Sequence, residues 1–216
     1  IRRDGEEEMA RPTGALFWSG IAAGLLISLS VLGEAILRTY LPDAEWRYLV
    51  ENLGYSLGFL AVILGRMQLF TENTITTVLP VMANPTRAHF VCAARLWTVV
   101  LLANVIGAFA VGALFALTSA IPDALHPAIR DLSLHATGFE PMTAFMRAIP
   151  AGVLVAAIVW MLPEAEGGEV WVVVFFTWLS AAGDFTHIVA GSVELAYLAW
   201  LGEIEFERAV FGFFLP

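Results

Sequence analysis

The sequence predicts an all-α integral membrane protein in which two halves of three helices each form an inverted repeat. Of its 216 residues, 59% are hydrophobic and 14% are charged, against roughly 45–50% and about 25% in a soluble domain. Residues 12–33 and 96–122 carry no charge, and each stretch exceeds the roughly 20 residues that span a bilayer as a helix. Two further apolar segments are each interrupted by polar residues. These observations predict six helices, with the second and fifth broken.

The first half is expected to hold a whole helix, a broken helix and a whole helix. Residues 1–11 form a polar N-terminal tail, and residues 12–216 form the transmembrane domain. Between the first two helices, Tyr40 and Trp46 mark a membrane interface. Apolar runs predict helices over 13–37, 49–65, 75–82 and 88–117, with the break of the second element at 66–74.

The second half repeats this order after a long polar loop. Helices are expected over 142–162, 170–182 and 188–201, with the second break at 183–187. The apolar run after Arg208 is expected to be the start of a sixth helix that is truncated in this chain. The chain does not begin with Met, so its natural start is also expected to be missing.

Paired breaks at corresponding places in two halves are the sequence sign of an inverted repeat with a site near the membrane midplane. Non-helical backbone at that depth is tolerated only inside protein or beside a watery cavity. The two breaks are therefore expected to meet at a pore. Arginines are divided evenly between the two sides, and the positive-inside rule weakly favours a cytoplasmic N-terminus in a multi-pass protein of the inner or plasma membrane.

Several classes of protein are excluded by composition. All eleven basic residues are arginine and form no continuous basic face, which excludes nucleic-acid binding. The single Cys92 is expected to be a small core residue. A haem or metal site needs several converging ligands, whereas the membrane interior offers His187, with His89 and Cys92 near the start of another helix, so no cofactor or metal is expected. No catalytic motif indicates an enzyme.

Four short motifs carry a resemblance to one family. They are Tyr55-Ser56-Leu57-Gly58, Gln68-Leu69-Phe70-Thr71, Ala103-Asn104-Val105-Ile106-Gly107-Ala108 and Gly183-Asp184-Phe185-Thr186-His187. In this order and spacing they resemble the motifs of the formate/nitrite transporter family, over residues 13–216. The resemblance implies an aquaporin-like fold, a ring of five subunits with one pore each, and passage of small monovalent anions such as formate, nitrite or hydrosulfide.

The resemblance also implies roles for individual residues of the substrate pore. His187 would be the central pore histidine and Thr71 its partner from the first break. Leu69 and Phe70 would form one constriction, and Tyr55, Phe59 and Val155 match positions near the other. An imidazole with a pKa near about 6.5 can lend a proton to a weak-acid anion, so transport is expected to be proton-assisted and to strengthen as pH falls. The alternative for His187 is a packed side chain bonded to a backbone carbonyl.

The sequence departs from the family's pattern at candidate selectivity modifiers. Thr186 stands where the family usually has Glu, and Gly152 where it usually has Asn. Arg66 and Glu72 flank the first break, and either attract the anion or form an ion pair that pins the loop. Asp184 is expected to cap the following half-helix rather than to face the pore.

Other polar residues are given ordinary roles. Glu34 and Glu194 are expected to make contacts between helices or with headgroups, and His126 and His135 to be solvated in the polar loop. The alternatives to an anion channel are a neutral small-solute channel and, with less support, a membrane-embedded enzyme or cofactor subunit.

Overall fold

The computed structural model describes residues 1–215, which fold into helices without any β-strand. The α-helices are α1 (Arg2–Ala10), α2 (Thr13–Leu26), α3 (Ser28–Tyr40), α4 (Arg47–Glu51), α5 (Ser56–Leu64), α6 (Phe70–Ala83), α7 (Arg87–Leu117), α8 (His126–Ala136), α9 (Pro141–Met161), α10 (Glu169–Ala182) and α11 (Ile188–Leu201). Short 3₁₀ helices cover Asn52–Tyr55, Asp123–Leu125 and Leu162–Glu164, and a π-helix covers Arg208–Phe214. The all-helical fold is confirmed.

Three helical spans are long and apolar enough to cross a membrane: Thr13–Tyr40, Arg87–Leu117 and Pro141–Glu164, of 28, 31 and 24 residues. The first contains α2 and α3, which are separated only at Ile27. There the Ser28 hydroxyl donates to the Leu25 carbonyl at 2.6 Å, while the Ile27 N–H still bonds to the Ala23 carbonyl at 2.9 Å. The predicted whole helix over 13–37 is therefore present but interrupted.

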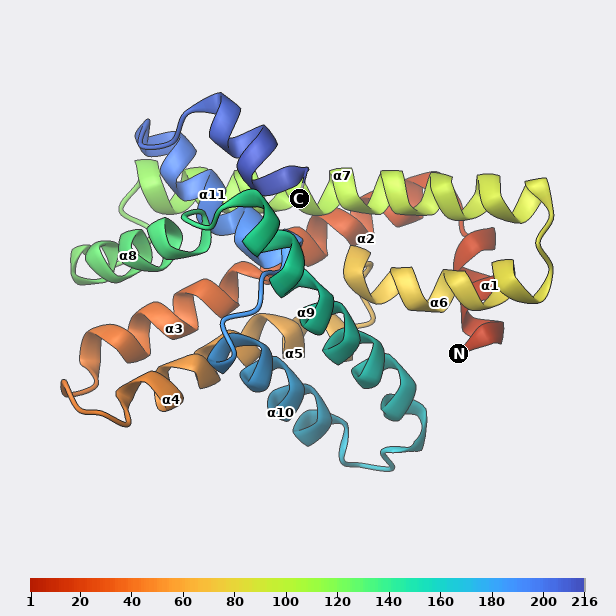
Figure 1. Ribbon diagram of the computed structural model, residues 1–216, viewed down its shortest axis with the longest axis horizontal. Helices are drawn as coiled ribbons and strands as arrows, with labels where there is room; N and C mark the ends of the chain where they lie inside the picture. The colour runs from red at the N-terminus through yellow and green to blue at the C-terminus, as the bar shows by residue number, and fades with distance from the viewer. Residues whose placement is uncertain (216) are drawn as a thin grey trace.

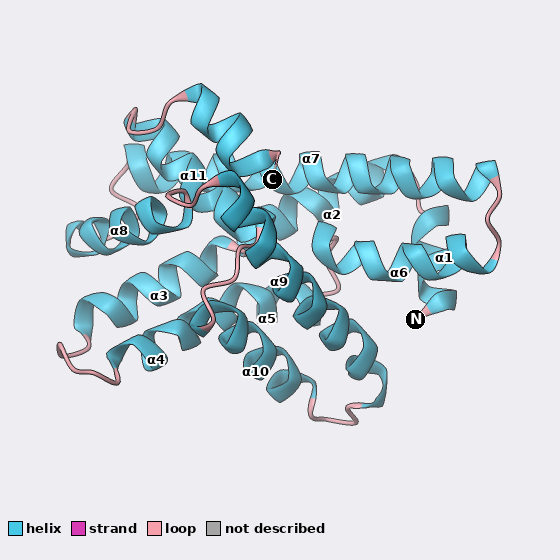
Figure 2. Cartoon of the chain, viewed as in Figure 1, coloured by secondary structure: helices cyan, strands magenta, loops and turns pink. Residues whose placement is uncertain are grey.

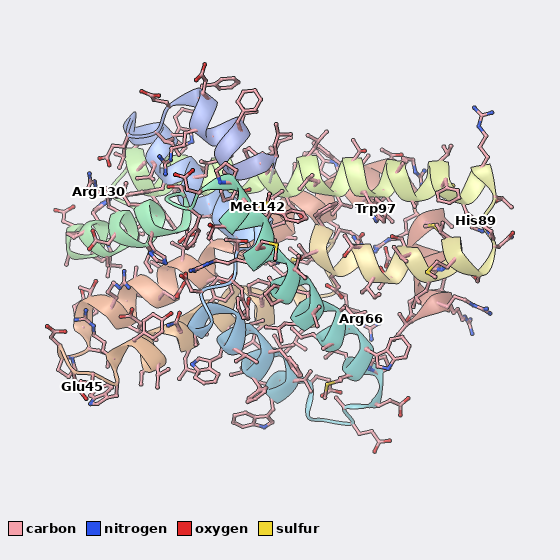
Figure 3. All side chains as sticks on the ribbon, viewed as in Figure 1. Glu45, Arg66, His89, Trp97, Arg130 and Met142 are labelled. Carbon is pink, nitrogen blue, oxygen red and sulfur yellow. The ribbon has the colours of Figure 1, made fainter. Side chains whose placement is uncertain are left out.

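Helix α7 is the central support of the fold. Figure 1 shows it as a long straight helix, with α8 and α11 near one end and α1 and α6 near the other. Trp97 of α7 bonds to Thr77 of α6 at 2.7 Å between Nε1 and Oγ1, and Figure 3 shows this tryptophan between the two helices. Against α11, Gly112 of α7 lies beside Ala196. One helix thus supports elements of both halves.

Helix α2 approaches α7 so closely that their backbones touch. A Cβ atom added to Gly24 would collide with the Asn104 carbonyl oxygen, and one added to Gly107 would collide with the Ile21 carbonyl oxygen. Small residues of this kind let membrane helices pack in direct contact.

This contact predicts that Gly24→Ala lowers the thermal midpoint of the detergent-solubilised protein. Forcing extra volume into a tight contact costs about 1–3 kcal/mol. Gly14→Ala is the matched control, because Gly14 lies on the same helix with open space around it and alanine favours a helix by roughly 1 kcal/mol over glycine. Equal midpoints for the two variants would contradict the close approach.

The two broken elements are α5–α6 and α10–α11, whose connections are drawn as loops in Figure 2. The second break, 183–187, agrees with the prediction. The first is shorter than predicted, because α6 begins at Phe70 and not after Thr74. Threonines inside α6 bond back to the helix, with Thr74 Oγ1 donating to the Thr71 carbonyl at 2.7 Å, so the polar residues there do not interrupt it.

Two helices lie where no helix was predicted. Residues 126–136, inside the predicted polar loop, form α8, whose Ile129 is fully buried in the main core. Residues 2–10, the predicted polar tail, form α1, which packs on α6 through Gly5 and Met9. Arg95 of α7 also holds α1, by donating to the Met9 carbonyl at 2.7 Å.

Candidate functional site

The two breaks meet at a hydrogen bond between Thr71 and His187. Thr71 is the second residue of α6, and His187 is the residue immediately before α11. Thr71 Oγ1 lies 2.9 Å from His187 Nε2. The N-terminal ends of both half-helices therefore face one point, which brings together the two residues that the sequence placed at the pore.

The first break is held by Asn104 of α7, which is fully buried. Its Oδ1 accepts a hydrogen bond from the Phe70 backbone N–H at 2.9 Å. Its Nδ2 donates to the carbonyls of Gln68 and Gly20, both at 2.8 Å. A single side chain thus satisfies two backbone groups that the broken helix leaves free, and it also ties the break to α2 through a second hydrogen bond on the Gly20 carbonyl.

The second break is held by Asp184, whose backbone has a φ of 57°. Its carboxylate accepts from His135 Nε2 at 2.7 Å and pairs with Arg147 of α9. Thr186 Oγ1 donates to the Ala144 carbonyl of α9 at 2.7 Å. The predicted capping role of Asp184 is wrong, since its carboxylate is turned toward α8 and α9, and the prediction of a solvated His135 missed this bond.

The cap of α11 is His187 itself. Its Nδ1 accepts a hydrogen bond from the Ala190 backbone N–H at 3.3 Å. In a neutral imidazole the nitrogen that accepts carries no proton, so the proton resides on Nε2. Nε2–H is then the donor that faces Thr71. The alternative of a histidine merely bonded to a carbonyl does not match these contacts.

Aromatic rings extend from His187 toward α5. The Phe59 and His187 ring centres lie 5.0 Å apart with planes at 86°, and the Tyr55 ring centre lies 5.0 Å from that of Phe59. Leu69 is completely buried. Phe70 packs against two separate clusters of buried apolar side chains. Apolar side chains therefore surround the histidine–threonine pair on the side of the first break.

The residues predicted on α9 lie farther along that helix. Ala144 and Ala148 line a cavity together with His187, whereas Gly152 is one helical turn beyond Ala148 and exposed. Val155 is buried, 6% exposed. The structure thus places the start of α9, rather than Gly152, beside the histidine.

In the described part of the chain, Arg66 and Glu72 do not form the ion pair that was considered for them. Arg66 is exposed, with a φ of 52°. Glu72 is in the first turn of α6, where its Oε2 is buried without a hydrogen-bond partner in the described structure. The N-terminal end of α6, which is the positive end of its helix dipole, lies next to this carboxylate.

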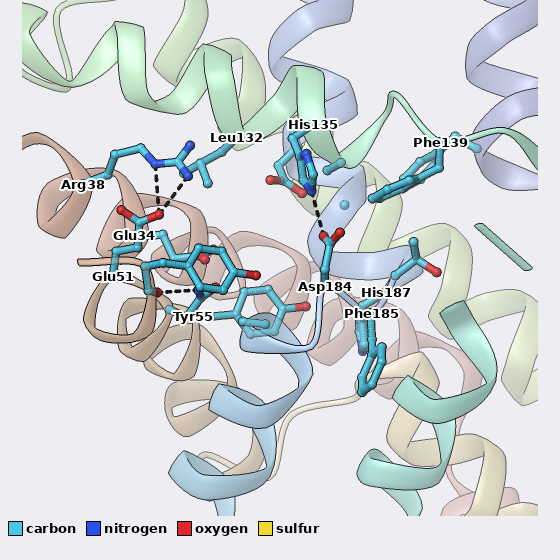
Figure 4. A pocket seen from close by; sticks show the side chains of 18 residues that line it. Glu34, Arg38, Glu51, Tyr55, Leu132, His135, Phe139, Asp184, Phe185 and His187 are labelled. Carbon is cyan, nitrogen blue, oxygen red and sulfur yellow. Dashed lines mark hydrogen bonds and ion pairs between the residues drawn. The ribbon is translucent and has the colours of Figure 1, made fainter. Parts of the chain in front are cut away.

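Two cavities reach His187, and Figure 4 shows the one that Glu34, Glu51 and Asp184 also line. One, of about 280 Å³, is mostly apolar and is lined by Ala148, Ile188 and Phe213. The other, of about 170 Å³, contains most of the ionisable side chains near His187 and is called the polar cavity here. Its ionisable lining residues are Glu34, Arg38, Tyr48, Glu51, Tyr55, His135, Asp184, His187 and Glu194. Within residues 1–215, no group of three or more His, Cys, Asp or Glu side chains is placed to hold a metal ion.

Glu34 and Glu194 were expected to make contacts between helices or with headgroups. Both line the polar cavity, and neither makes a hydrogen bond or ion pair through its carboxylate in the described part of the chain. A sequence signal did exist, because an ionisable residue within a membrane helix is a functional candidate by default.

Comparisons with known proteins agree with this geometry. Residues 1–216 match the family model described as formate/nitrite transporter. The whole chain is 42% identical to the inner membrane protein YfdC of Escherichia coli (strain K12), covering 70% of that protein. Over 184 residues, 81% of this chain, it is 29% identical to the formate channel FocA of Haemophilus influenzae, covering 63% of it.

A solved structure, a pentameric formate channel with formate bound, superposes with a TM-score of 0.77 at 20% sequence identity. The match covers 93% of this chain and 88% of the other. The two chains therefore share a fold.

Proposed function

Because the chain belongs to the formate/nitrite transporter family of membrane proteins, we propose that it is a channel for small monovalent anions of weak acids. The anions that we propose are those of the formate and nitrite type. The pore is proton-assisted through His187 at its centre. The proposed substrate residues are His187, Thr71, Leu69, Phe70, Tyr55, Phe59 and Val155.

The observation that carries the proposal is the hydrogen bond between Thr71 and His187. It places the N-termini of α6 and α11 at one point, and each N-terminus presents a positive dipole end and free N–H groups. Half-helix N-termini aimed at one point near the midplane are how membrane transporters hold an anionic group. An anion that replaced Thr71 as the partner of His187 Nε2–H would occupy that point.

The histidine lowers the barrier that apolar side chains impose. A bare charge near the bilayer centre costs at least about 2.5–3.5 kcal/mol. Phe59 is 1% exposed and Leu69 is fully buried, so this part of the path offers the anion little hydration. Nε2–H donates a hydrogen bond to the anion, or lends it the proton, and the permeating species then becomes nearly neutral.

The assembly that we propose is a homopentamer in the inner membrane, with the N-terminus in the cytoplasm and residues 12–216 as the channel domain. The solved relative with the same fold is described as pentameric. Large apolar side chains on the surface of the chain, such as Trp18, Met142 and Trp171, are 70–75% exposed. They suit contact with lipid or with neighbouring subunits.

A neutral-solute channel is the second candidate, because the polar cavity leading to His187 has four carboxylates in its lining. Free anions are repelled by ionised carboxylates. In a neutral-solute channel, His187 would neither bond to an anion nor lend it a proton.

The two candidates are separated by flux into proteoliposomes at pH 5.5 and pH 7.5 with formate, nitrite, hydrosulfide, chloride and glycerol. We expect formate and nitrite flux above that of protein-free liposomes, rising at the lower pH, with little glycerol flux. Glycerol flux without anion flux would favour the neutral-solute channel. Anion flux that is flat between the two pH values would contradict proton assistance.

A further inference from the structure

Arg147 is a charged residue inside a membrane-spanning helix. It lies in α9, within the apolar span Pro141–Glu164, and its side chain is 36% exposed. An ionisable residue at such a position is costly and is by default a functional candidate. None of the four motifs shared with the family contains Arg147, and it lines neither cavity that reaches His187. The structure therefore indicates a role that Arg147 plays through another residue.

The partner of Arg147 is Asp184, in the second break. One guanidinium nitrogen, Nη1, donates to the Asp184 backbone carbonyl at 3.0 Å and also to the carboxylate oxygen Oδ2. The guanidinium lies over the Phe139 ring, 4.4 Å from its centre, and this cation–π contact limits where the side chain can go. The other carboxylate oxygen accepts from His135 at 2.7 Å. Arg147 thus holds both the backbone and the side chain of one residue.

Asp184 needs this support because its backbone is strained. Its φ of 57° lies in the left-handed region, which is uncommon for a residue other than glycine and persists where the surrounding structure fixes it. Within the turn, the Asp184 N–H bonds to the Ala181 carbonyl at 2.9 Å and the Phe185 N–H to the Ser180 carbonyl at 3.0 Å. His187 follows in an extended conformation, with φ −137° and ψ 117°. The direction of the His187 side chain therefore depends on the turn at Asp184.

Helix α9 is the element to which the second break is fixed. Besides Arg147, it provides the Ala144 carbonyl, which accepts from Thr186 Oγ1 at 2.7 Å. Asn104 of α7 fixes the first break in a similar way, by bonding to its backbone groups. The support of the second break differs because it carries a charge, which the Asp184 carboxylate balances. Removing one member of an ion pair also leaves the other charge uncompensated, so the two effects of Arg147 are separated only by changing both residues.

We propose that Arg147 is a positioning residue of the pore. By holding Asp184 it fixes the left-handed turn, and the turn directs His187 Nε2–H toward Thr71, where the two half-helix N-termini meet. Arg147 does not touch the anion; it sets the place from which the histidine does. The expected effect on flux rests on the proposed anion channel, whereas the effect on the orientation of His187 is measured without transport.

The test compares Arg147→Met with the unaltered protein by two measurements. Methionine keeps an apolar stem over Phe139 but has no N–H donor. The first measurement is nitrogen NMR of the protein with isotope-labelled histidine in lipid nanodiscs, where the His187 signals are identified by their loss in His187→Ala. In Arg147→Met these signals are expected to split or broaden, because the imidazole takes up several positions. The second is formate flux into proteoliposomes, which is expected to fall about tenfold, since misplacing a functional group by about 1 Å can cost up to about 100-fold.

Two double variants separate the support of the turn from the balance of charge. Adding Asp184→Gly or Asp184→Ala to Arg147→Met removes the unpaired carboxylate in both cases. Only glycine adopts a positive φ without strain, so the turn then needs no support. We expect the glycine double variant to recover most of the flux and the alanine double variant to recover little. Equal recovery in the two would mean that Arg147 only neutralises Asp184, and would overturn the positioning role.

Arg130→Met is the matched control. Arg130 forms an ion pair of similar exposure with Glu203, at 2.7 Å, and lines neither cavity that reaches His187. Its loss should leave the His187 signals unchanged and formate flux within about twofold. Arg147→Lys is expected to restore both measurements, because one ammonium nitrogen has donors for both contacts that Nη1 makes.

Thermal melting shows whether each variant is folded. If Arg147→Met does not fold, the two double variants are compared by both measurements. Unchanged His187 signals in a folded Arg147→Met protein would overturn the inference. Altered His187 signals in a protein whose unaltered form carries no anion would support the positioning role and count against the proposed channel.

Discussion

Formate flux into proteoliposomes is expected to fall about 100-fold when His187 is replaced by alanine, because the anion then meets the apolar constriction as a bare charge. A barrier increase of about 2.7 kcal/mol corresponds to this factor. The lost interaction is the Nε2–H donor, whose present partner is Thr71 at 2.9 Å. The remaining flux should also lose the part of its pH dependence that comes from the imidazole.

His89→Ala is the matched control for this experiment. His89 lies at the far end of α7 from the site, as Figure 3 shows, so the same change of residue there should leave flux within about twofold, as is usual for surface substitutions away from functional features. Thermal melting of both variants shows whether the fold is retained. Undiminished formate flux through a folded His187→Ala protein would show that the histidine is a packing residue.

The second large effect is expected from Asn104→Leu, which removes the three hydrogen bonds that hold the first break. The Phe70 N–H and the Gln68 carbonyl would be left buried without partners, and the Gly20 carbonyl would lose its second hydrogen bond. Orphaned buried polar groups cost about 1–3 kcal/mol each, although bonds between membrane helices are often worth less. We expect a loss of about 2–4 kcal/mol in unfolding free energy, measured by denaturation in mixed micelles, and loss of flux below the melting temperature.

The matched control is Asn84→Leu, since Asn84 is exposed at the end of α6. It should leave both stability and flux nearly unchanged. A folded Asn104→Leu protein with full flux would show that the backbone of the break positions itself without the asparagine.

The sequence predicted the long helices well, because their signal is the length of uncharged residues. Helix α7 was expected over 88–117 and covers Arg87–Leu117. The second break and the half-helix Ile188–Leu201 were also predicted correctly. The pairing of Thr71 with His187, which the family resemblance implied, matches a hydrogen bond in the structure, while their role in transport remains a proposal.

The errors arose where the partners or the burial of a residue are not visible in the nearby sequence pattern. Thr74 bonds to a carbonyl of its own helix, and residues 70–74, which were predicted as part of the break, are helical. Helix α8 mixes its apolar residues with Pro127, Arg130 and Asp131, and only the tertiary structure shows that Ile129 is buried. The partners of Asp184 are 49 and 37 residues away in the chain, a separation at which no local pattern indicates pairing.

The length of α7 also ties the site to the thickness of the bilayer. Its uncharged part, Leu96 to Leu117, rises about 33 Å, close to a hydrocarbon layer of about 30 Å, and Arg95 stands immediately outside it. A thicker membrane must thin around this helix or draw Arg95 inward, at a modest cost per ångström of mismatch. Asn104 on the same helix holds the first break. The length of the lipid acyl chains therefore acts mechanically on the Thr71–His187 pair, without any ligand.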